Sequence, residues 1–268
     1  MKITDDGFSL RKIFALEHLE KFDSGATFPM LIRGVCKETQ IKGEYVVKYM
    51  AGRIDKDASC RELLGSFLAM QFDLYVPEPV LIEISGDFVN TIEYLSDLSY
   101  INNCIGDNFG SEYMPGFIQI LNEQTLNGIQ ITDAVNIFAF DILISNADRR
   151  VDKHNLLSDG KRLMIFDHEL AFGFLFAIVQ NTKPWIIAEE DLYWIKNHIF
   201  YNRLKQIKPR FDDFVERLDI IDEKFWLRAD TFIPREWQTS GYLKIKKHIA
   251  EIKKNKDVFL QQLNNLVI

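Results

Sequence analysis

The stretch NADRRVDKHNLL at residues 146–157, followed by IFDHE at residues 165–169, decides how the fold of this chain is interpreted. Apolar residues flank the turn-forming sequence Ser158-Asp159-Gly160, so the pattern predicts a small hairpin. Asn155 opens this hairpin and Asp167 closes it. Because a hairpin brings its two ends together, we expect these two side chains to be neighbours.

The polar residues of this segment have the chemistry that phosphoryl transfer requires. Asn155 and Asp167 both offer hard oxygen atoms, which are the ligands that Mg²⁺ prefers. Asp148 follows a strongly apolar segment at residues 133–144, whose spacing predicts a buried helix. The aspartate would then stand beside the two metal ligands, where it could orient or deprotonate a hydroxyl group.

The first third of the chain contains a lysine, Lys48, that could act together with these polar residues. Short β-branched and aromatic runs predict strands at residues 30–35, 45–49, 80–84 and 88–93. Ser59 and Glu62 have the spacing of a capping box and predict a helix between the second and third strands. Lys48 lies on a strand and Glu62 on the next helix, so Glu62 could hold Lys48 within reach of nucleotide phosphates. Two simpler roles stay open: Glu62 completes the capping box, and Lys48 protects an exposed strand edge.

The order of these elements predicts an α+β fold with two lobes. Strands and one helix fill the first part of the chain, and from about residue 97 the pattern becomes helical, interrupted by the hairpin. We therefore expect a small β-rich N-lobe at residues 1–96, with an antiparallel sheet and one helix. The larger, mostly helical C-lobe would span residues 97–268 and carry the catalytic and metal-binding segment at residues 146–169.

Composition excludes several other classes of protein. The chain has 268 residues and a net charge of −7, which argues against direct binding to nucleic acid. Its three cysteines, Cys36, Cys60 and Cys104, are far apart and predict neither a disulfide framework nor a zinc site. The longest apolar stretch, at residues 170–179, is too short to cross a bilayer. We expect a cytoplasmic protein that does not insert into a membrane.

The motifs resemble those of HipA-like kinases, in particular the smaller, single-unit group within the protein-kinase-like and phosphoinositide-kinase-like superfamily. The resemblance spans roughly residues 20 to 175. It rests on residues 146–150, 155–157 and 166–168, together with YVVK at 45–48, RELL at 61–64 and YVPEP at 75–79. It implies a two-lobed protein-kinase-like fold that binds ATP and Mg²⁺, with the nucleotide held by the N-lobe.

The resemblance also implies a role for each matching residue. Asp148 would be the catalytic aspartate, and Asn155 and Asp167 would bind magnesium. Lys48 would bind the ATP phosphates and pair with Glu62.

The resemblance implies two further nucleotide contacts in the N-lobe. Ser24, Gly25 and Thr27 would form the turn over the phosphates, although the chain has no G-x-G-x-x-G motif. The hinge that bonds the adenine would include Glu93 and Leu95.

The chain departs from the common kinase pattern near the catalytic aspartate. Asn155 lies seven residues after Asp148, whereas five is the usual spacing, and Lys153 occupies the nearer position. The metal-binding triplet is Asp-His-Glu rather than Asp-Phe-Gly, so Glu169 could add a ligand.

Two arginines follow the catalytic aspartate. Either Arg149 or Arg150 could stabilise the transferred phosphate, because a guanidinium group matches phosphate oxygens, and Arg150 is the residue we assign to catalysis. The resulting hypothesis is a kinase acting on a hydroxyl group, most simply that of Ser or Thr in a protein. A small-molecule acceptor, a pseudokinase that acts through a regulatory or antitoxin-like partner, and a metal-dependent hydrolase are the alternatives.

Overall fold

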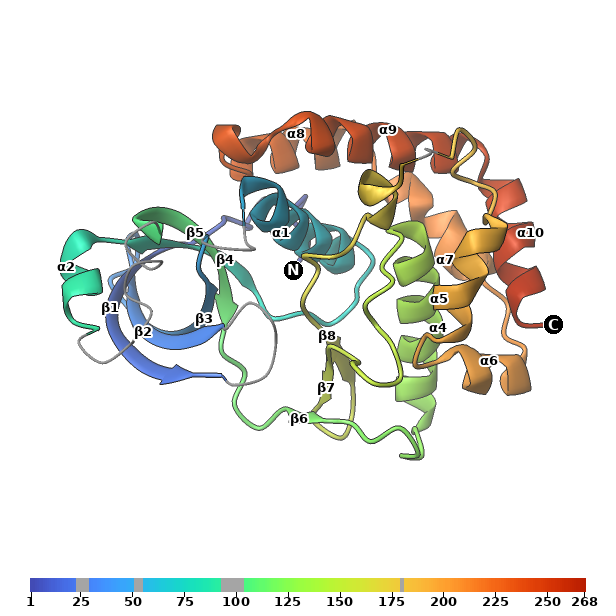
Figure 1. Ribbon diagram of the computed structural model, residues 1–268, viewed down its shortest axis with the longest axis horizontal. Helices are drawn as coiled ribbons and strands as arrows, with labels where there is room; N and C mark the ends of the chain where they lie inside the picture. The colour runs from blue at the N-terminus through green and yellow to red at the C-terminus, as the bar shows by residue number, and fades with distance from the viewer. Residues whose placement is uncertain (23–28, 51–54, 93–103, 179–180) are drawn as a thin grey trace.

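The computed structural model describes residues 1–22, 29–50, 55–92, 104–178 and 181–268. Within them, the N-terminal region is built around a closed five-stranded barrel, seen on the left of Figure 1. Its strands are β1 (Lys12–Lys21), β2 (Met30–Cys36), β3 (Lys42–Lys48), β4 (Pro79–Ile84) and β5 (Gly106–Glu112). The strands predicted at residues 30–35, 45–49 and 80–84 are confirmed as β2, β3 and β4.

The barrel closes through a parallel pair of strands. Its order is β1-β2-β3-β5-β4, and β1 runs parallel to β4, with Ile13 opposite Ile82. Alternate side chains such as Ile13, Ile32, Val47 and Ile82 fill a small apolar core inside the barrel. The predicted antiparallel sheet is therefore corrected to a closed barrel, because β1 pairs with both β2 and β4.

Strand β5 lies beyond the expected boundary between residues 96 and 97, so the β-rich region continues past it. Its sequence, GDNFGSE, contains few residues that favour strands. A Cβ atom on Gly110 would lie 2.2 Å from the side chain of Ile82 and 2.9 Å from the carbonyl oxygen of Val46. Close packing against β3 and β4 thus selects glycine here, which hides the strand from a propensity argument.

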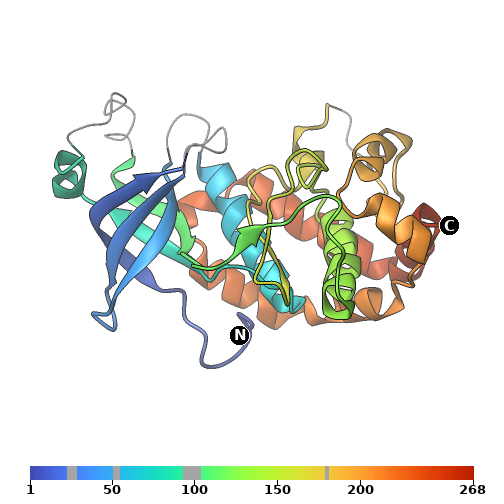
Figure 2. The ribbon, with the colours of Figure 1, turned by 90° about the horizontal axis from the view of Figure 1, so that it is seen from below.

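Helix α1 (Lys56–Gln71) lies between the barrel and the C-terminal helices (Figures 1 and 2). Thirteen of its sixteen residues are buried, because it packs on β4 and β5 as well as on α9. Asp55 caps it, with its carboxylate accepting the backbone N–H of Ala58 at 2.8 Å. The predicted capping box is therefore wrong, because Ser59 and Glu62 both lie buried inside the helix. Aspartate caps as well as serine, and the polar first turn conceals the true start of the helix.

The strand predicted at residues 88–93 is also wrong. Those residues begin inside helix α2 (Gly86–Asn90). Ser85 caps this helix, accepting the backbone N–H of Phe88 at 3.1 Å. The Ser-Gly-Asp sequence that is typical of a hairpin turn serves here as a helix start.

The predicted hairpin is confirmed, and a long helix positions it. The strands are β6 (Ile118–Gln119), β7 (Leu156–Ser158) and β8 (Leu163–Ile165), and β7 pairs with both of the others. The predicted buried helix is α4 (Gly128–Leu143), which begins at a capping box of Asn127 and Gln130. Asp133 of α4 accepts the backbone N–H of Leu163 at 2.9 Å, which fixes the hairpin against the helix.

The rest of the chain is mainly helical, as predicted. It contains α5 (Leu192–Lys196), α6 (Tyr201–Ile207), α7 (Asp212–Glu216), α8 (Glu223–Phe232), α9 (Ser240–Lys254) and α10 (Lys256–Leu266). Buried side chains of these helices form one large apolar core together with those of α1 and α4. The β-rich N-terminal region and the helical C-terminal region confirm the α+β organisation. Among the described residues, no helix combines the length and apolar character needed to cross a membrane.

Candidate active site

Lys48, the last residue of β3, lies at the centre of a buried cluster of charges. Strand alternation points Val47 into the barrel and Lys48 toward the opposite side. The Lys48 Nζ contacts the carboxylates of Glu62, of Asp167 at 2.6 Å and of Glu169 at 3.1 Å. The ion pair between Lys48 and Glu62 is present, and the binding of a phosphate by Lys48 stays a prediction.

Glu62 connects three separate parts of the chain. One of its carboxylate oxygens contacts Lys48 of β3. The other accepts the backbone N–H of His168, at 2.8 Å, in the segment that follows β8. Because Glu62 belongs to α1, the position of that helix sets the position of both partners.

The segment from Asp167 to Glu169 lies directly against α1. Arg61 donates its Nε–H to the carbonyl oxygen of Glu169 at 2.6 Å. Opposite them, a Cβ atom on Gly65 would lie 2.6 Å from the Cβ of His168, so only glycine permits this approach. The backbone of Asp167 has a left-handed φ of 64°, a conformation that aspartate adopts more readily than most residues.

A second group of polar side chains surrounds Asp148. Asn155 donates its side-chain N–H to the Oδ2 of Asp148 at 3.0 Å, and the Nζ of Lys153 lies 2.6 Å from the same oxygen. The Lys153 Nζ also lies 3.9 Å from the Oδ2 of Asp167. The backbone ends of the hairpin meet, with the N–H of Phe166 donating to the carbonyl oxygen of Asn155, and a shared metal site of Asn155 and Asp167 stays a prediction. Lys153, which the motif comparison leaves without a role, therefore connects the two groups of acids.

The two arginines after Asp148 occupy different environments. Arg149 is buried, donates its Nε–H to Asp141 at 2.6 Å and bonds the carbonyl oxygen of Asn155 at 2.5 Å. This burial corrects the expectation that Arg149 could bind the transferred phosphate, since its guanidinium group is already engaged inside the protein. The side chain of Arg150 is 44% exposed and lies 3.4 Å from Asp152. The catalytic role of Arg150 stays a prediction.

Five of the expected nucleotide contacts lie outside the described residues. They are Ser24, Gly25 and Thr27 of the expected phosphate turn, and Glu93 and Leu95 of the expected hinge.

The charges of the buried cluster do not balance. Burial would lower the pKa of Lys48, but attraction to three carboxylates outweighs burial and raises it. Burial raises the pKa of Glu62 to about 7, although the contact with Lys48 acts in the opposite direction. Burial would likewise raise the pKa of Asp167, but Lys48 holds it below its usual range. Three carboxylates share the ammonium group of Lys48, and of these Lys153 approaches only Asp167, at 3.9 Å, so the cluster could accommodate a further cation.

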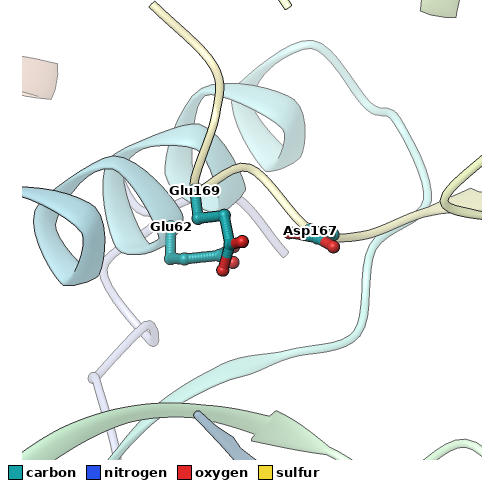
Figure 3. Close-up of side chains that lie close together, drawn as sticks. All are labelled: Glu62, Asp167 and Glu169. Carbon is teal, nitrogen blue, oxygen red and sulfur yellow. The ribbon is translucent and has the colours of Figure 1, made fainter. Parts of the chain in front are cut away.

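The same carboxylates could hold a metal ion. One oxygen from each of Glu62, Asp167 and Glu169 lies within 4.8 Å of the others. Figure 3 shows the carboxylates of Glu62 and Glu169 meeting beside α1, with Asp167 on the neighbouring loop. An all-oxygen set fits Mg²⁺, and Glu62 is already engaged by two partners. Asp167 and Glu169 are the better candidates, because each keeps one carboxylate oxygen that accepts no hydrogen bond from the described residues. The sequence signal for Glu169 is the Asp-His-Glu triplet.

A family model described as HipA-like kinase matches residues 16–265, which is nearly the whole chain. This chain belongs to the HipA-like kinase family, and the match extends the resemblance into the C-terminal helices. A comparison with curated proteins found no match. Solved structures do match, among them the Neurospora crassa PAN3 pseudokinase, which is 11% identical with a TM-score of 0.35, over 96% of this chain and 67% of that one.

Proposed function

We propose that this chain is an ATP- and Mg²⁺-dependent kinase with a two-lobed fold, which transfers the γ-phosphate to a hydroxyl group. Ser or Thr of a protein is the acceptor class to test first. The proposal is carried by a continuous run of contacts. Lys48 contacts Asp167, whose second oxygen faces Lys153, and Lys153 in turn contacts Asp148. The adjacency of these three residues supports their proposed roles as phosphate-binding cation, metal ligand and base, because phosphoryl transfer needs those groups side by side.

The N-terminal residues of the site would bind and orient the phosphates. Lys48 exchanges part of its carboxylate contacts for phosphate oxygens, while Glu62 keeps its ammonium group in place. Asp167 and Glu169 would hold Mg²⁺, with Asn155 supplying an amide oxygen after its side chain rotates. A bound Mg²⁺ would supply charge neutralisation at the phosphate oxygens.

Asp148 would act as the base for the acceptor. Its Oδ2 is held by Lys153 and Asn155, and its Oδ1 has no hydrogen-bond partner among the described residues. Oδ1 is therefore available to accept the hydroxyl proton as the hydroxyl oxygen bonds to the γ-phosphorus. The bond between that phosphorus and the bridging oxygen breaks at the same time, and ADP leaves.

The test is transfer of labelled γ-phosphate in the presence of Mg²⁺. Wild type is compared with Asp148→Asn and Asp167→Asn, and Asp6→Asn is the matched control because its carboxylate is fully exposed and its ion-pair partner, Lys224, lies outside the site. We expect label on a protein substrate, or on the chain itself, with wild type and the control, and none with the two site variants. If the label appears only on a small molecule, the proposed reaction stands but the acceptor is a small molecule rather than a protein.

One observation favours a second candidate, a regulatory module that binds nucleotide without transferring phosphate. Lys153 forms an ion pair with Asp148 and so already occupies the carboxylate that would have to face the acceptor hydroxyl. In this case the chain would act through a partner protein, for example an antitoxin-like one. Thermal stabilisation by ATP with no phosphate transfer under any condition would support this candidate over the kinase.

A further inference from the structure

The position of Lys153 bears on how many metal ions the site can hold, a question that rests on the proposed function. Protein kinases hold two Mg²⁺ ions with two residues. One is the asparagine five residues after the catalytic aspartate, and the other is the aspartate that follows the hairpin. In this chain the fifth residue after Asp148 is Lys153. An ammonium group has three donors and no lone pair, so it cannot replace an amide oxygen as a metal ligand.

The contacts of Lys153 place its charge where a cation is needed. Its Nζ is 2.6 Å from Asp148 and 3.9 Å from Asp167, the two carboxylates that flank the expected phosphate path. Asp167 thus lies between two ammonium groups, because its other oxygen is 2.6 Å from Lys48. The side chain of Lys153 is 34% exposed, so its ammonium group is within reach of a bound molecule as well as of these acids.

We propose that Lys153 is a fixed cation that takes the place of one of the two metal ions, so the site loads a single divalent ion with each nucleotide. Its ammonium group donates hydrogen bonds to phosphate oxygens and repels a second divalent ion from the space between Asp148 and Asp167. The single ion is held by Asp167 and Glu169 once Lys48 exchanges part of its contacts with these carboxylates for phosphate oxygens.

The experiment counts bound metal rather than activity. Mn²⁺ is titrated into the full chain in the presence of a non-hydrolysable ATP analogue, and bound ions per bound nucleotide are counted by electron paramagnetic resonance. We expect one Mn²⁺ with wild type and two with Lys153→Asn, which restores an amide at the fifth position. Lys161→Asn, an exposed lysine near the hairpin turn, is the control and should behave as wild type.

The outcomes separate this inference from the proposed function. Two Mn²⁺ ions in wild type, or one in both wild type and Lys153→Asn, would overturn the inference while nucleotide binding stands. No nucleotide binding by wild type would overturn the proposed function and the inference with it. Lys153→Met is a second variant in case the asparagine variant does not fold, and loss of the ammonium group should let a second, weaker Mn²⁺ bind.

Discussion

Replacing Arg149 by methionine should unfold the chain far more readily than the same change at Arg150. The Arg149 side chain is fully buried and bonds Asp141 through two nitrogens, at 2.6 and 3.3 Å. Without it, the buried carboxylate of Asp141 keeps hydrogen bonds from His198 Nε2 at 3.0 Å and from the Asn146 side-chain amide at 2.9 Å, but it loses its guanidinium partner. Burial lowers the pKa of His198, and its Nδ1 accepts the N–H of Phe200 at 3.1 Å, so this histidine is neutral.

The expected loss in the free energy of unfolding of Arg149→Met follows from leaving Asp141 without a counterion. Removing one partner of a buried ion pair typically costs about 3–5 kcal/mol, because the remaining charge has no counterion. Arg149 also bonds the carbonyl oxygens of His154 and Asn155, and those groups lose their donor as well. Arg150→Met should cost no more than about 0.5 kcal/mol, because that side chain is half exposed.

Urea denaturation followed by circular dichroism measures both variants under the same conditions. The double variant Arg149→Met with Asp141→Asn should recover about 0.5–3 kcal/mol of the lost free energy of unfolding, because it also removes the unpaired charge of Asp141. Equal stability losses at Arg149 and Arg150 would refute the reasoning, and so would a double variant whose loss is the full sum of the single ones.

Three further predictions concern residues near the candidate site. Gly65→Ala should lower the free energy of unfolding by about 1–3 kcal/mol in urea denaturation, because the new methyl group meets His168 at 2.6 Å. The better helix propensity of alanine is too small to compensate. A stabilised variant would contradict this contact. Burial lowers the pKa of His248 to about 4 from 6.5, so the free energy of unfolding should fall by about 1 kcal/mol between pH 7 and 5.5 as the unfolded state takes up the proton. His248→Phe keeps the stack on Phe174 and should remove that part of the pH dependence, which an unchanged profile would contradict. Lys48→Met should lower the melting temperature at pH 8 and less at pH 5, because it leaves three carboxylates without their ammonium group; equal losses at both pH values would argue against charge imbalance as the cause.

Local signals explain what the sequence predicts correctly. The hairpin has a strong turn sequence at residues 158–160, and α4 has a sustained apolar run, so both are predictable from neighbours in the chain. Strand β5 is not, because Gly110 is dictated by Ile82, which is distant in sequence. The start of α1 is hidden for a different reason, since its first turn is polar and its cap is Asp55.

The candidate site likewise combines contacts that the sequence predicts with contacts that it does not. Glu62 and Lys48 are paired as expected, because consecutive elements bring them together. The partners of Arg149 and Lys153 depend on tertiary contacts. The motif alone predicts a phosphate-binding role for Arg149 and no role for Lys153. One signal was available: Asp141 is a lone acid within the apolar run FAFDIL, and a buried carboxylate requires a cationic or hydrogen-bonding partner.

Two buried ionic clusters of this chain differ in whether their charges balance. In the first, Asp141 is matched by the guanidinium group of Arg149, so nothing further is needed to balance it. In the second, Lys48 is shared by three carboxylates, which is an unfavourable arrangement for a cluster whose only task is stability. A well-packed apolar replacement would serve the fold better at that place. The excess negative charge could accommodate a cation, as the proposed function requires, and it lies where α1, β3 and the segment after β8 meet.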